Sequence, residues 1–517
     1  MNRKGKETGM KLRTACITLA FTALIFIPTA AASAILTLNP LQRFQTIEGF
    51  GAMTTNASPA LLANDLGVSM SRFNLPTRFC PSKGTYSATA IASEFQRMNE
   101  LKAAGITRWI TSVWTPPGWM KDMSRDRSAS CWDGPNECGG HLSAARYQDF
   151  TDMVVAYCKE VKKQTGVDLY AFSIQNELEF AQPYISCVYT PDEYAAVVKL
   201  LGPALKAAGL PVRLYGPETM IHWARDFETP LMRDANGKDN FGAFAYHGYV
   251  DGVNPVSSSE AAAKWRDIKG RLAKYGKPLW MTETSGMTES WEGAANLAGN
   301  IYAALRHGDL TAWTFWLECG SGAASGSLEG LLLSDCTHSL RSLVSKNYYK
   351  WIRPDAVRIN AGFNGDSTGL FAVAFDHTAN KTLTIVLLNT NSSSRTVSID
   401  GGNCPAGLQH FSTSRSERCV DKGSVSSAGV TVGGNSVNTL YATGYESPLG
   451  IRHQTVRFAV AQNASPLPAA MQAYDLRGKH LGAGAVTRTN TVTVVKAGNG
   501  CPTRVRINYA SYAQANK

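Results

Sequence analysis

The stretch Leu169–Phe180, "LYAFSIQNELEF", begins like a buried β-strand and ends in polar residues. Its first six residues carry little charge or polarity, and the run then reaches Gln175, Asn176 and Glu177. Carboxylates are rarely buried without partners. When strands of a parallel barrel end in such residues, the side chains emerge at the barrel mouth, where functional sites of these folds lie. The stretch therefore predicts a parallel strand that delivers an amide and an acid to such a mouth.

Seven further segments share this character, being apolar runs that end in polar or aromatic residues. In chain order the eight runs are "TIEGFGAM" (46–53), "MSRFNL" (70–75), "TRWITSVW" (107–114), "DLYAFSIQNE" (168–177), "VRLYGPE" (212–218), "FGAFAYHGY" (241–249), "PLWMTETSG" (278–286) and "AWTFWL" (312–317). Segments with helical spacing separate several of them, and four of these end in Gly, as helix C-termini prefer. Alternating strands and helices predict a parallel sheet, and eight units predict a (β/α)8 barrel, which we place at residues 47–350.

The pattern changes after the barrel. Residues 351–445 are rich in Val, Thr, Ser, Gly and Asn, and alternate in "LFAVAFD" and "TLTIVLLNT". Short strands broken by turn residues predict an antiparallel β-sandwich side domain, to which residues 35–46 add a strand. Residues 446–517 form a small C-terminal β-rich region, which is either an accessory module or an extension of the sandwich.

Residues 1–34 have the features of a secretory signal peptide. Five basic residues precede the apolar run "ACITLAFTALIFI", and small residues, "PTAAASA", close the segment. The apolar run is too short for a comfortable membrane span, and no later segment reaches that length. We therefore expect a secreted protein without a membrane span.

Charge and cysteine content bear on nucleic-acid binding, disulfides and metal sites. The chain has 517 residues and a formal charge of +11, of which +4 lies in residues 1–34. No cluster of Lys and Arg with interleaved aromatic residues favours nucleic-acid binding. Ten cysteines follow Cys16, and an even count in an exported chain favours disulfides. The close pairs are Cys131/Cys138, Cys319/Cys336 and Cys404/Cys419. No cysteine or histidine grouping has zinc spacing, so we expect no metal site and no cofactor.

Two of the predicted barrel strands end in glutamates that can act together. The fourth run ends at Glu177 and the seventh at Thr282-Glu283. Strands four and seven lie across a barrel from each other, so the two carboxyl groups can face each other over a cleft. Two carboxyl groups about 5–5.5 Å apart are the arrangement for retaining glycoside hydrolysis. The sequence therefore predicts this chemistry for Glu177 and Glu283.

Several motifs in this order resemble glycoside hydrolase family 30, and above all its bacterial xylanase branch. They are "IEGFGAM", "SVWTPPGWM", "LYAFSIQNE", "AYHGY", "LWMTETSG" and "YYKWIRPDAVRI". The resemblance implies that Glu177 is the acid/base and Glu283 the nucleophile. It also implies that Asn176 holds the sugar 2-hydroxyl. Leu178 stands where the family usually has Pro, a change in loop shape and not in chemistry.

The same resemblance suggests roles at other strand ends. Arg72 would orient the nucleophile and keep its pKa low, as a neighbouring cation does. His247 and Tyr249 end strand six, where a tyrosine commonly hydrogen-bonds the nucleophile. Trp114 and Trp316 are placed to stack on sugar rings. We expect a structural role for Glu218 and Glu318, and at most a supporting or substrate-loop role for Glu179. Trp119 fits a sugar platform and a core residue equally well.

The resemblance leaves the glycan open. A xylanase acting on plant cell-wall xylan is the first expectation, with a β-1,6-glucanase, a glucosylceramidase-like enzyme or a glucuronoxylanase as alternatives. The segment after strand eight, "TFWLECGSGAASGS", has no basic residue to bind a glucuronic acid branch; Arg225, in another loop, is the alternative, without support from the sequence. A non-catalytic carbohydrate-binding protein is the remaining class. We expect a monomer whose partner is a polysaccharide.

Overall fold

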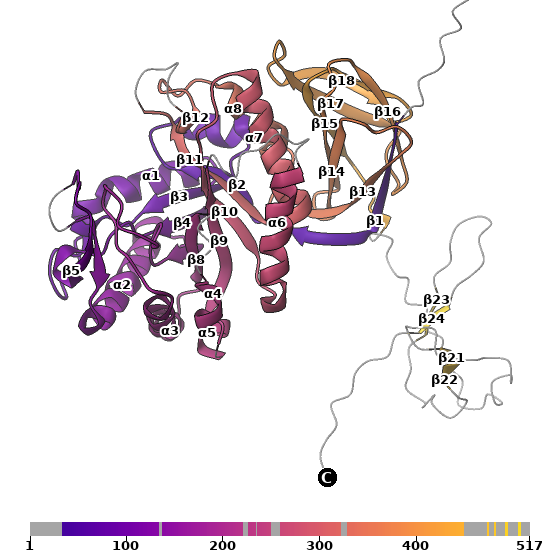
Figure 1. The fold of residues 1–517 in the computed structure, drawn as a ribbon. Coiled ribbons are helices and arrows are strands. Elements are labelled where there is room, and N and C mark those ends of the chain that lie inside the picture. The colour runs from indigo at the N-terminus through magenta and orange to yellow at the C-terminus, as the bar shows by residue number, and fades with distance from the viewer. Residues whose placement is uncertain are drawn as a thin grey trace, which may run out of the picture.

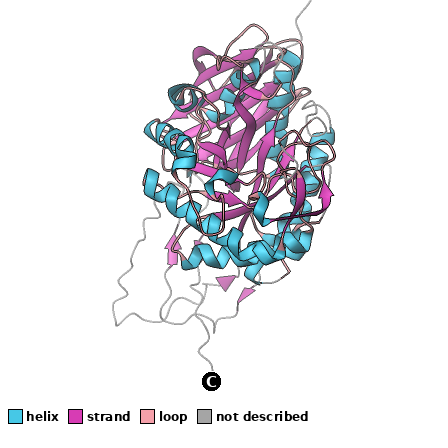
Figure 2. Ribbon diagram, turned by 90° about the vertical axis from the view of Figure 1, so that its left-hand side faces the viewer, coloured by secondary structure: helices cyan, strands magenta, loops and turns pink. Residues whose placement is uncertain are grey.

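The computed structural model describes residues 34–133, 137–220, 226–233, 235–249, 259–321 and 328–448, and four short strands beyond them. Two bodies of secondary structure lie side by side (Figure 1). One is built around parallel strands with helices outside them, and the other contains strands alone (Figures 1 and 2).

Eight parallel strands close into a barrel, which confirms the predicted fold. They are β2 (Gly49–Met53), β3 (Met70–Asn74), β4 (Arg108–Ser112), β7 (Ala171–Ser173), β8 (Arg213–Met220), β9 (Phe241–Gly248), β10 (Leu279–Thr284) and β11 (Ala312–Cys319). Each pairs with its neighbours in this order, and β11 pairs with both β10 and β2, which closes the ring. A short strand, β12 (Gly330–Leu332), runs parallel to β11.

Helices cover the outside of the barrel. They are α1 (Ala92–Ala103), α2 (Tyr147–Thr165), α3 (Pro191–Ala207), α4 (Glu228–Leu231), α5 (Ala235–Asn240), α6 (Ser259–Leu272), α7 (Trp291–Ala303) and α8 (Leu340–Tyr349). Local sequence fixes their ends: α2 stops at Gly166, whose φ is 74°, and Thr190 begins α3 with a reciprocal capping box to Glu193. None of the described helices combines the length and the apolar character needed to cross a membrane.

The N-terminal end of the barrel is filled. Trp280 of β10 is fully buried, and the strands around it supply small residues such as Ala171, Ala243 and Ala312. Its Nε1 donates to the Glu48 carboxylate (3.0 Å), directly before β2. Because packed side chains close this end, a ligand can enter the barrel only at the opposite end, where the strands finish.

The second body is the predicted β-sandwich. Its strands are β1 (Ala34–Thr46), β13 (Val357–Asn364), β14 (Leu370–His377), β15 (Thr382–Asn389), β16 (Arg395–Asp400), β17 (Gly407–Ser414), β18 (Val420–Ser426), β19 (Val430–Val432) and β20 (Ser436–Thr443). The pairings are antiparallel except between β1 and β16. Figure 1 shows β1, from the start of the described chain, among strands from its C-terminal part. This strand begins at Ala34, one residue before the predicted boundary.

The sandwich packs on α8 and the segment after it. Asn347 Nδ2 donates to Thr439 Oγ1 (3.0 Å), and Thr439 Oγ1 donates in turn to the Asn347 carbonyl (2.7 Å). The ring of Trp351 lies 4.3 Å from that of Phe411. The segment "YYKWIRPDAVRI" therefore both joins the two bodies along the chain and supplies contacts between them.

Two of the three suggested disulfides form, and the third does not. Cys131 is bonded to Cys138 and Cys319 to Cys336, whereas Cys404 and Cys419 are free. Cys404 precedes β17 and Cys419 precedes β18, and these strands form an antiparallel hairpin. The two thiols therefore lie at opposite ends of the hairpin, beyond the reach of a disulfide. The Cys404/Cys419 prediction is wrong.

In the C-terminal region, β21 (Ala473–Tyr474) pairs with β22 (His480–Leu481), and β23 (Val492–Val494) pairs with β24 (Val505–Ile507). These pairs lie within residues 446–517, the region predicted to be rich in strands. The other residues from 449 onward, and residues 1–33 of the predicted signal peptide, lie outside the described residues.

Candidate active site

Glu177 and Glu283 both lie at the C-terminal end of the barrel, on strands four and seven. Glu177 follows the end of β7 by four residues, and Glu283 is part of β10. Both are almost fully buried, with exposed fractions of 2% and 4%. Glu177 has a φ of 43°, a backbone conformation that non-glycine residues rarely adopt. Such conformations cluster at functional sites, where surrounding contacts hold them in place.

The polar end of the "LYAFSIQNELEF" stretch is held by the neighbouring strand's loop. Asn176 N donates to the Val113 carbonyl (2.7 Å), and Gln175 Nε2 donates to the Trp114 carbonyl (2.6 Å). The Gln175 side chain therefore has a structural role. The turn that it fixes brings Asn176 and Glu177 into the site.

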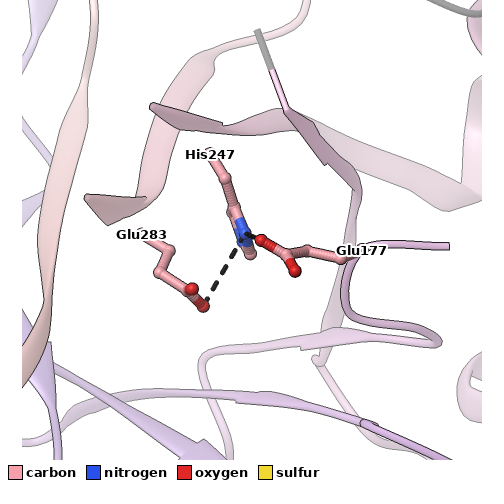
Figure 3. A group of neighbouring side chains, drawn as sticks. All are labelled: Glu177, His247 and Glu283. Carbon is pink, nitrogen blue, oxygen red and sulfur yellow. Dashed lines mark hydrogen bonds and ion pairs between the residues drawn. The ribbon is translucent and has the colours of Figure 1, made fainter. Parts of the chain in front are cut away.

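His247 bridges the two acids (Figure 3). Its Nδ1 lies 3.0 Å from Glu177 Oε1 and 3.7 Å from Glu283 Oε2. The two carboxylates approach the imidazole ring from different sides. One nitrogen of His247 and one oxygen of each glutamate all lie within 4.8 Å of one another. The two carboxyl groups therefore face one shared space, as the paired carboxyl groups of glycoside hydrolysis do.

Arg72, in the middle of β3, holds three acceptors from strands four, five and seven. Its guanidinium donates to Glu283 Oε2 (2.6 Å), Asn176 Oδ1 (2.7 Å) and Glu218 Oε1 (3.1 Å). The side chain is fully buried. A planar guanidinium with fixed donor directions therefore sets the relative positions of these three groups.

Glu218 belongs to this cluster, although the sequence favours a structural role for it. It is fully buried at the end of β8, has a φ of 59°, and also lies 3.5 Å from His247 Nε2. Burial alone would raise its pKa, but the charge of Arg72 and the contact with His247 lower the pKa of Glu218 to about 2. Glu218 is therefore a permanent anion that balances one of the two buried cations.

Charge balance then determines the protonation of the catalytic pair. Burial would lower the pKa of His247, yet the Glu283 charge and the hydrogen bond to Glu177 raise it to about 10. Arg72 and His247 thus carry two positive charges against three buried carboxyl groups. Because Glu218 is ionised, a neutral cluster holds one proton on either Glu177 or Glu283. One acid and one carboxylate are the state that retaining hydrolysis requires.

In the unliganded site, the contacts favour that proton on Glu283. Burial raises the pKa of Glu283, and so does the charge of Glu177. Burial acts in the same direction on Glu177, but hydrogen bonds from His247 and Tyr184 outweigh it and lower the pKa of Glu177. The position on strand four therefore favours Glu177 as the acid, whereas the proton of the unliganded site is favoured on Glu283.

Each glutamate has one further tyrosine. The Tyr184 hydroxyl donates to Glu177 Oε2, which also accepts from Gln182 Nε2 (3.0 Å). The Tyr249 hydroxyl donates to Glu283 Oε1. Burial and the adjacent carboxylate raise the pKa of both tyrosines, so both stay protonated donors.

The trio Glu177, His247 and Glu283 has donor types that metals accept, but its charges disfavour an ion. A metal needs neutral imidazole, whereas the pKa of His247 is raised to about 10. Arg72 already supplies a positive charge 2.6 Å from Glu283.

Two of the three predicted tryptophans adjoin the cluster. The ring of Trp114 lies 4.6 Å from the Arg72 guanidinium carbon and 5.9 Å from the half-buried ring of Trp316. Trp119 instead donates its Nε1 to the Cys80 carbonyl (3.0 Å) and packs on the core. These contacts support a structural role for Trp119 over a role as a sugar platform.

Two other acids have local partners. Glu179 is buried, accepts from Met220 N (3.0 Å), and burial raises its pKa to about 8. Glu318 pairs with Arg97 (2.8 Å). Neither contacts the pair of glutamates through a hydrogen bond among the described residues.

All eight residues singled out from the sequence gather here: Arg72, Trp114, Asn176, Glu177, His247, Tyr249, Glu283 and Trp316. Sequence analysis missed Gln182 and Tyr184, which lie in a loop without periodicity. Arg225 lies outside the described residues. Cys319, near the place expected for a glucuronate-binding arginine, is bonded to Cys336.

Comparison with known proteins matches both bodies. Residues 355–440 match the family model described as "Glycosyl hydrolase family 30 beta sandwich domain". The chain is 24% identical over 277 residues to the glucuronoxylanase XynC of Bacillus subtilis, covering 48% of this chain and 58% of that protein. It is also 24% identical over 380 residues to an endo-1,6-beta-D-glucanase of Neurospora crassa, covering 68% and 72%. The chain spans about three fifths of the length of the bacterial glucuronoxylanases that it matches.

A solved structure extends the likeness to the whole fold. The GH30 endoxylanase from Clostridium papyrosolvens C71 superposes with a TM-score of 0.64 at 23% identity, covering 79% of this chain and 100% of that one. The resemblance to glycoside hydrolase family 30 thus has support in both bodies: residues 355–440 match that family's beta sandwich domain, and the chain shares the fold of the GH30 endoxylanase.

Proposed function

We propose that this chain is a retaining β-glycoside hydrolase, with Glu177 as acid/base and Glu283 as nucleophile. The observation that carries the proposal is the buried pair of carboxylates within 4.8 Å at the end of the barrel where the strands finish. With Arg72 and His247 positively charged and Glu218 negatively charged, the cluster is neutral when the pair Glu177 and Glu283 carries one proton.

In the first step Glu177 gives its proton to the glycosidic oxygen while Glu283 attacks the anomeric carbon. The bond to the leaving group breaks, and a glycosyl ester of Glu283 forms. In the second step Glu177 takes a proton from water, the water oxygen attacks the anomeric carbon, and the ester bond breaks. Both displacements invert the anomeric carbon, so the product retains the β configuration.

During the reaction the proton that the unliganded site favours on Glu283 has to be on Glu177. Positive charge develops at the anomeric carbon in the oxocarbenium-like transition state. This charge lies against Glu283 and stabilises its ionised form, which lowers the pKa of Glu283 relative to the empty site. The shared proton then belongs on Glu177, against the leaving-group oxygen.

We infer that the substrate is xylan and the action endo-β-1,4. The sequence motifs, the match to a bacterial glucuronoxylanase and the likeness to an endoxylanase structure support this choice. The described loop after β11 offers no basic side chain for an acidic branch, so cleavage does not require glucuronic acid. A β-1,6-glucan is the second candidate, since the fungal endo-1,6-glucanase matches a larger share of this chain. The basic and apolar N-terminal segment supports export of the protein.

The test is hydrolysis of glucuronoxylan, unbranched xylan and β-1,6-glucan, with the first-formed anomer followed by NMR. We expect β-configured product from unbranched xylan. Glu283→Gln is expected to lose nearly all turnover and still bind the polysaccharide. An α anomer appearing first would exclude the retaining mechanism. A wild type that binds glycan without cleaving it would indicate a carbohydrate-binding protein on this barrel.

A further inference from the structure

Trp132 is the most exposed of the large apolar side chains that stand out at the described surface, with 75% of its area accessible. A single exposed apolar side chain is common at a protein surface and is not by itself a binding site. Trp132 is a different residue from the three tryptophans that the sequence motifs single out. Its position relative to Glu177 and Glu283 suggests a role in substrate binding.

The ring of Trp132 lies 6.5 Å from the ring of Tyr184, tilted by 46°. Tyr184 donates its hydroxyl to Glu177 Oε2. A single tyrosine therefore separates the exposed indole from the proposed acid. Trp132 is therefore linked to the pair through the tyrosine that hydrogen-bonds Glu177, whereas Glu283 accepts from a different tyrosine, Tyr249.

The backbone around Trp132 is tied to the loop that carries Tyr184. Trp132 N donates to the Pro183 carbonyl (2.8 Å), and Ile185 N donates to Asp133 Oδ2 (3.1 Å). The adjacent Cys131 is bonded to Cys138. The indole is thus held in place without being covered, which is what a binding platform requires because little ordering remains to be done on binding.

Position along the substrate follows from the chemistry of Glu177. The acid protonates the oxygen of the leaving group, so sugar units beyond it belong to the leaving-group half of the chain. An exposed, flat, amphipathic ring suits the apolar face of a pyranose. We propose that Trp132 is a stacking platform for a sugar residue on the leaving-group side of the cleaved bond. This inference rests on the proposed hydrolase function and adds a specificity-determining residue to it.

The test compares two substrates that share the glycosyl half and differ in the leaving group. The polysaccharide has sugars on the leaving-group side, whereas a β-glycosyl fluoride made from its disaccharide has one atom there. For Trp132→Ala we expect KM on the polysaccharide to rise about tenfold, the scale of one lost aromatic contact. Both kcat and KM on the fluoride should stay within about twofold of wild type. Transfer of the glycosyl unit from the fluoride to an added oligosaccharide should fall relative to hydrolysis, because the acceptor occupies the same side.

Two controls separate stacking from a structural effect. Trp132→Phe keeps an aromatic face and should retain most of the affinity for polysaccharide. Leu41→Ala removes another exposed apolar side chain, 68% accessible, from β1 of the sandwich, and should change nothing.

Each outcome has one meaning. Wild-type KM on polysaccharide in Trp132→Ala would overturn the inference and leave the hydrolase proposal standing. An equal loss of kcat on both substrates would also overturn it, since Trp132 would then act through Tyr184 on Glu177. A wild type without turnover of either substrate would refute the hydrolase function itself.

Discussion

Arg72 Nη1 lies 2.6 Å from Glu283 Oε2, and both side chains are buried. The two residues are 211 positions apart in the chain, on β3 and β10, and meet only because the barrel closes. The same guanidinium reaches Asn176 and Glu218, so one side chain links strands two, four, five and seven of the barrel.

Arg72→Lys tests this linkage. Lysine keeps the charge but has no planar fork, so it cannot donate to Glu283, Asn176 and Glu218 together. We expect kcat/KM to fall by about 10²-fold or more, the scale of a lost electrostatic contact in a transition state. Arg271→Lys, in an exposed pair with Asp267, is the matched control and should behave as wild type. Near-normal kinetics in Arg72→Lys would show that charge alone suffices.

The protonated state of His247 predicts a pH dependence of stability. Its folded pKa, about 10, lies above that of a free histidine, so its contribution is complete below about pH 6.5. That contribution is lost as the pH rises from there towards 10. His247→Gln should therefore cost stability on the order of a few kcal/mol at pH 6.5 and clearly less at pH 9.5. Urea unfolding of both proteins at the two values measures the difference. A cost that does not change with pH would mean that His247 is neutral.

The buried carboxyl group of Glu179 predicts a second pH dependence of stability. Burial raises its pKa to about 8, whereas an unfolded glutamate ionises near pH 4.5. The folded state therefore holds a proton that the unfolded state releases, and stability falls as the pH rises from about 4.5 to 8. Glu179→Gln removes this penalty. We expect the variant to gain on wild type in thermal unfolding between pH 5 and pH 8, with unchanged turnover at pH 6. A gain that shrinks with rising pH would contradict a neutral Glu179.

Azide rescue distinguishes the roles of the two glutamates. Azide is a small nucleophile that needs no general base, so it can replace the function that alanine removes. With a β-glycosyl fluoride as substrate, Glu177→Ala plus azide should give a β-glycosyl azide from the covalent intermediate. Glu283→Ala plus azide should give the α-glycosyl azide by a single inversion. Exchange of these two products between the variants would reverse the assignment.

The sequence predicted those parts of the site that strand ends carry. Glu177, Glu283 and His247 lie at or near the ends of apolar runs, Arg72 lies within one, and the parallel barrel brings these positions together. Glu218 also ends a run, but its role depends on Arg72, 146 positions away, and no local pattern reports that contact.

Tyr184, Gln182 and Trp132 could not be predicted, because their loops lack the periodicity of a strand or helix. Their positions follow from tertiary contacts, such as the bond from Trp132 N to Pro183. The Cys404/Cys419 pairing failed for a related reason: closeness along the chain did not reveal that a hairpin separates the two thiols.

Covalent trapping tests the central claim most directly. A 2-deoxy-2-fluoro glycosyl fluoride of the preferred sugar destabilises the transition states of both steps, yet its good leaving group lets the first proceed, so the glycosyl-enzyme accumulates. Digestion and mass spectrometry then locate the ester. The account predicts one sugar per chain, attached to the Glu283 carboxylate in the peptide that contains "LWMTETSG". A label on Glu177, or an active enzyme that is never labelled, would contradict it.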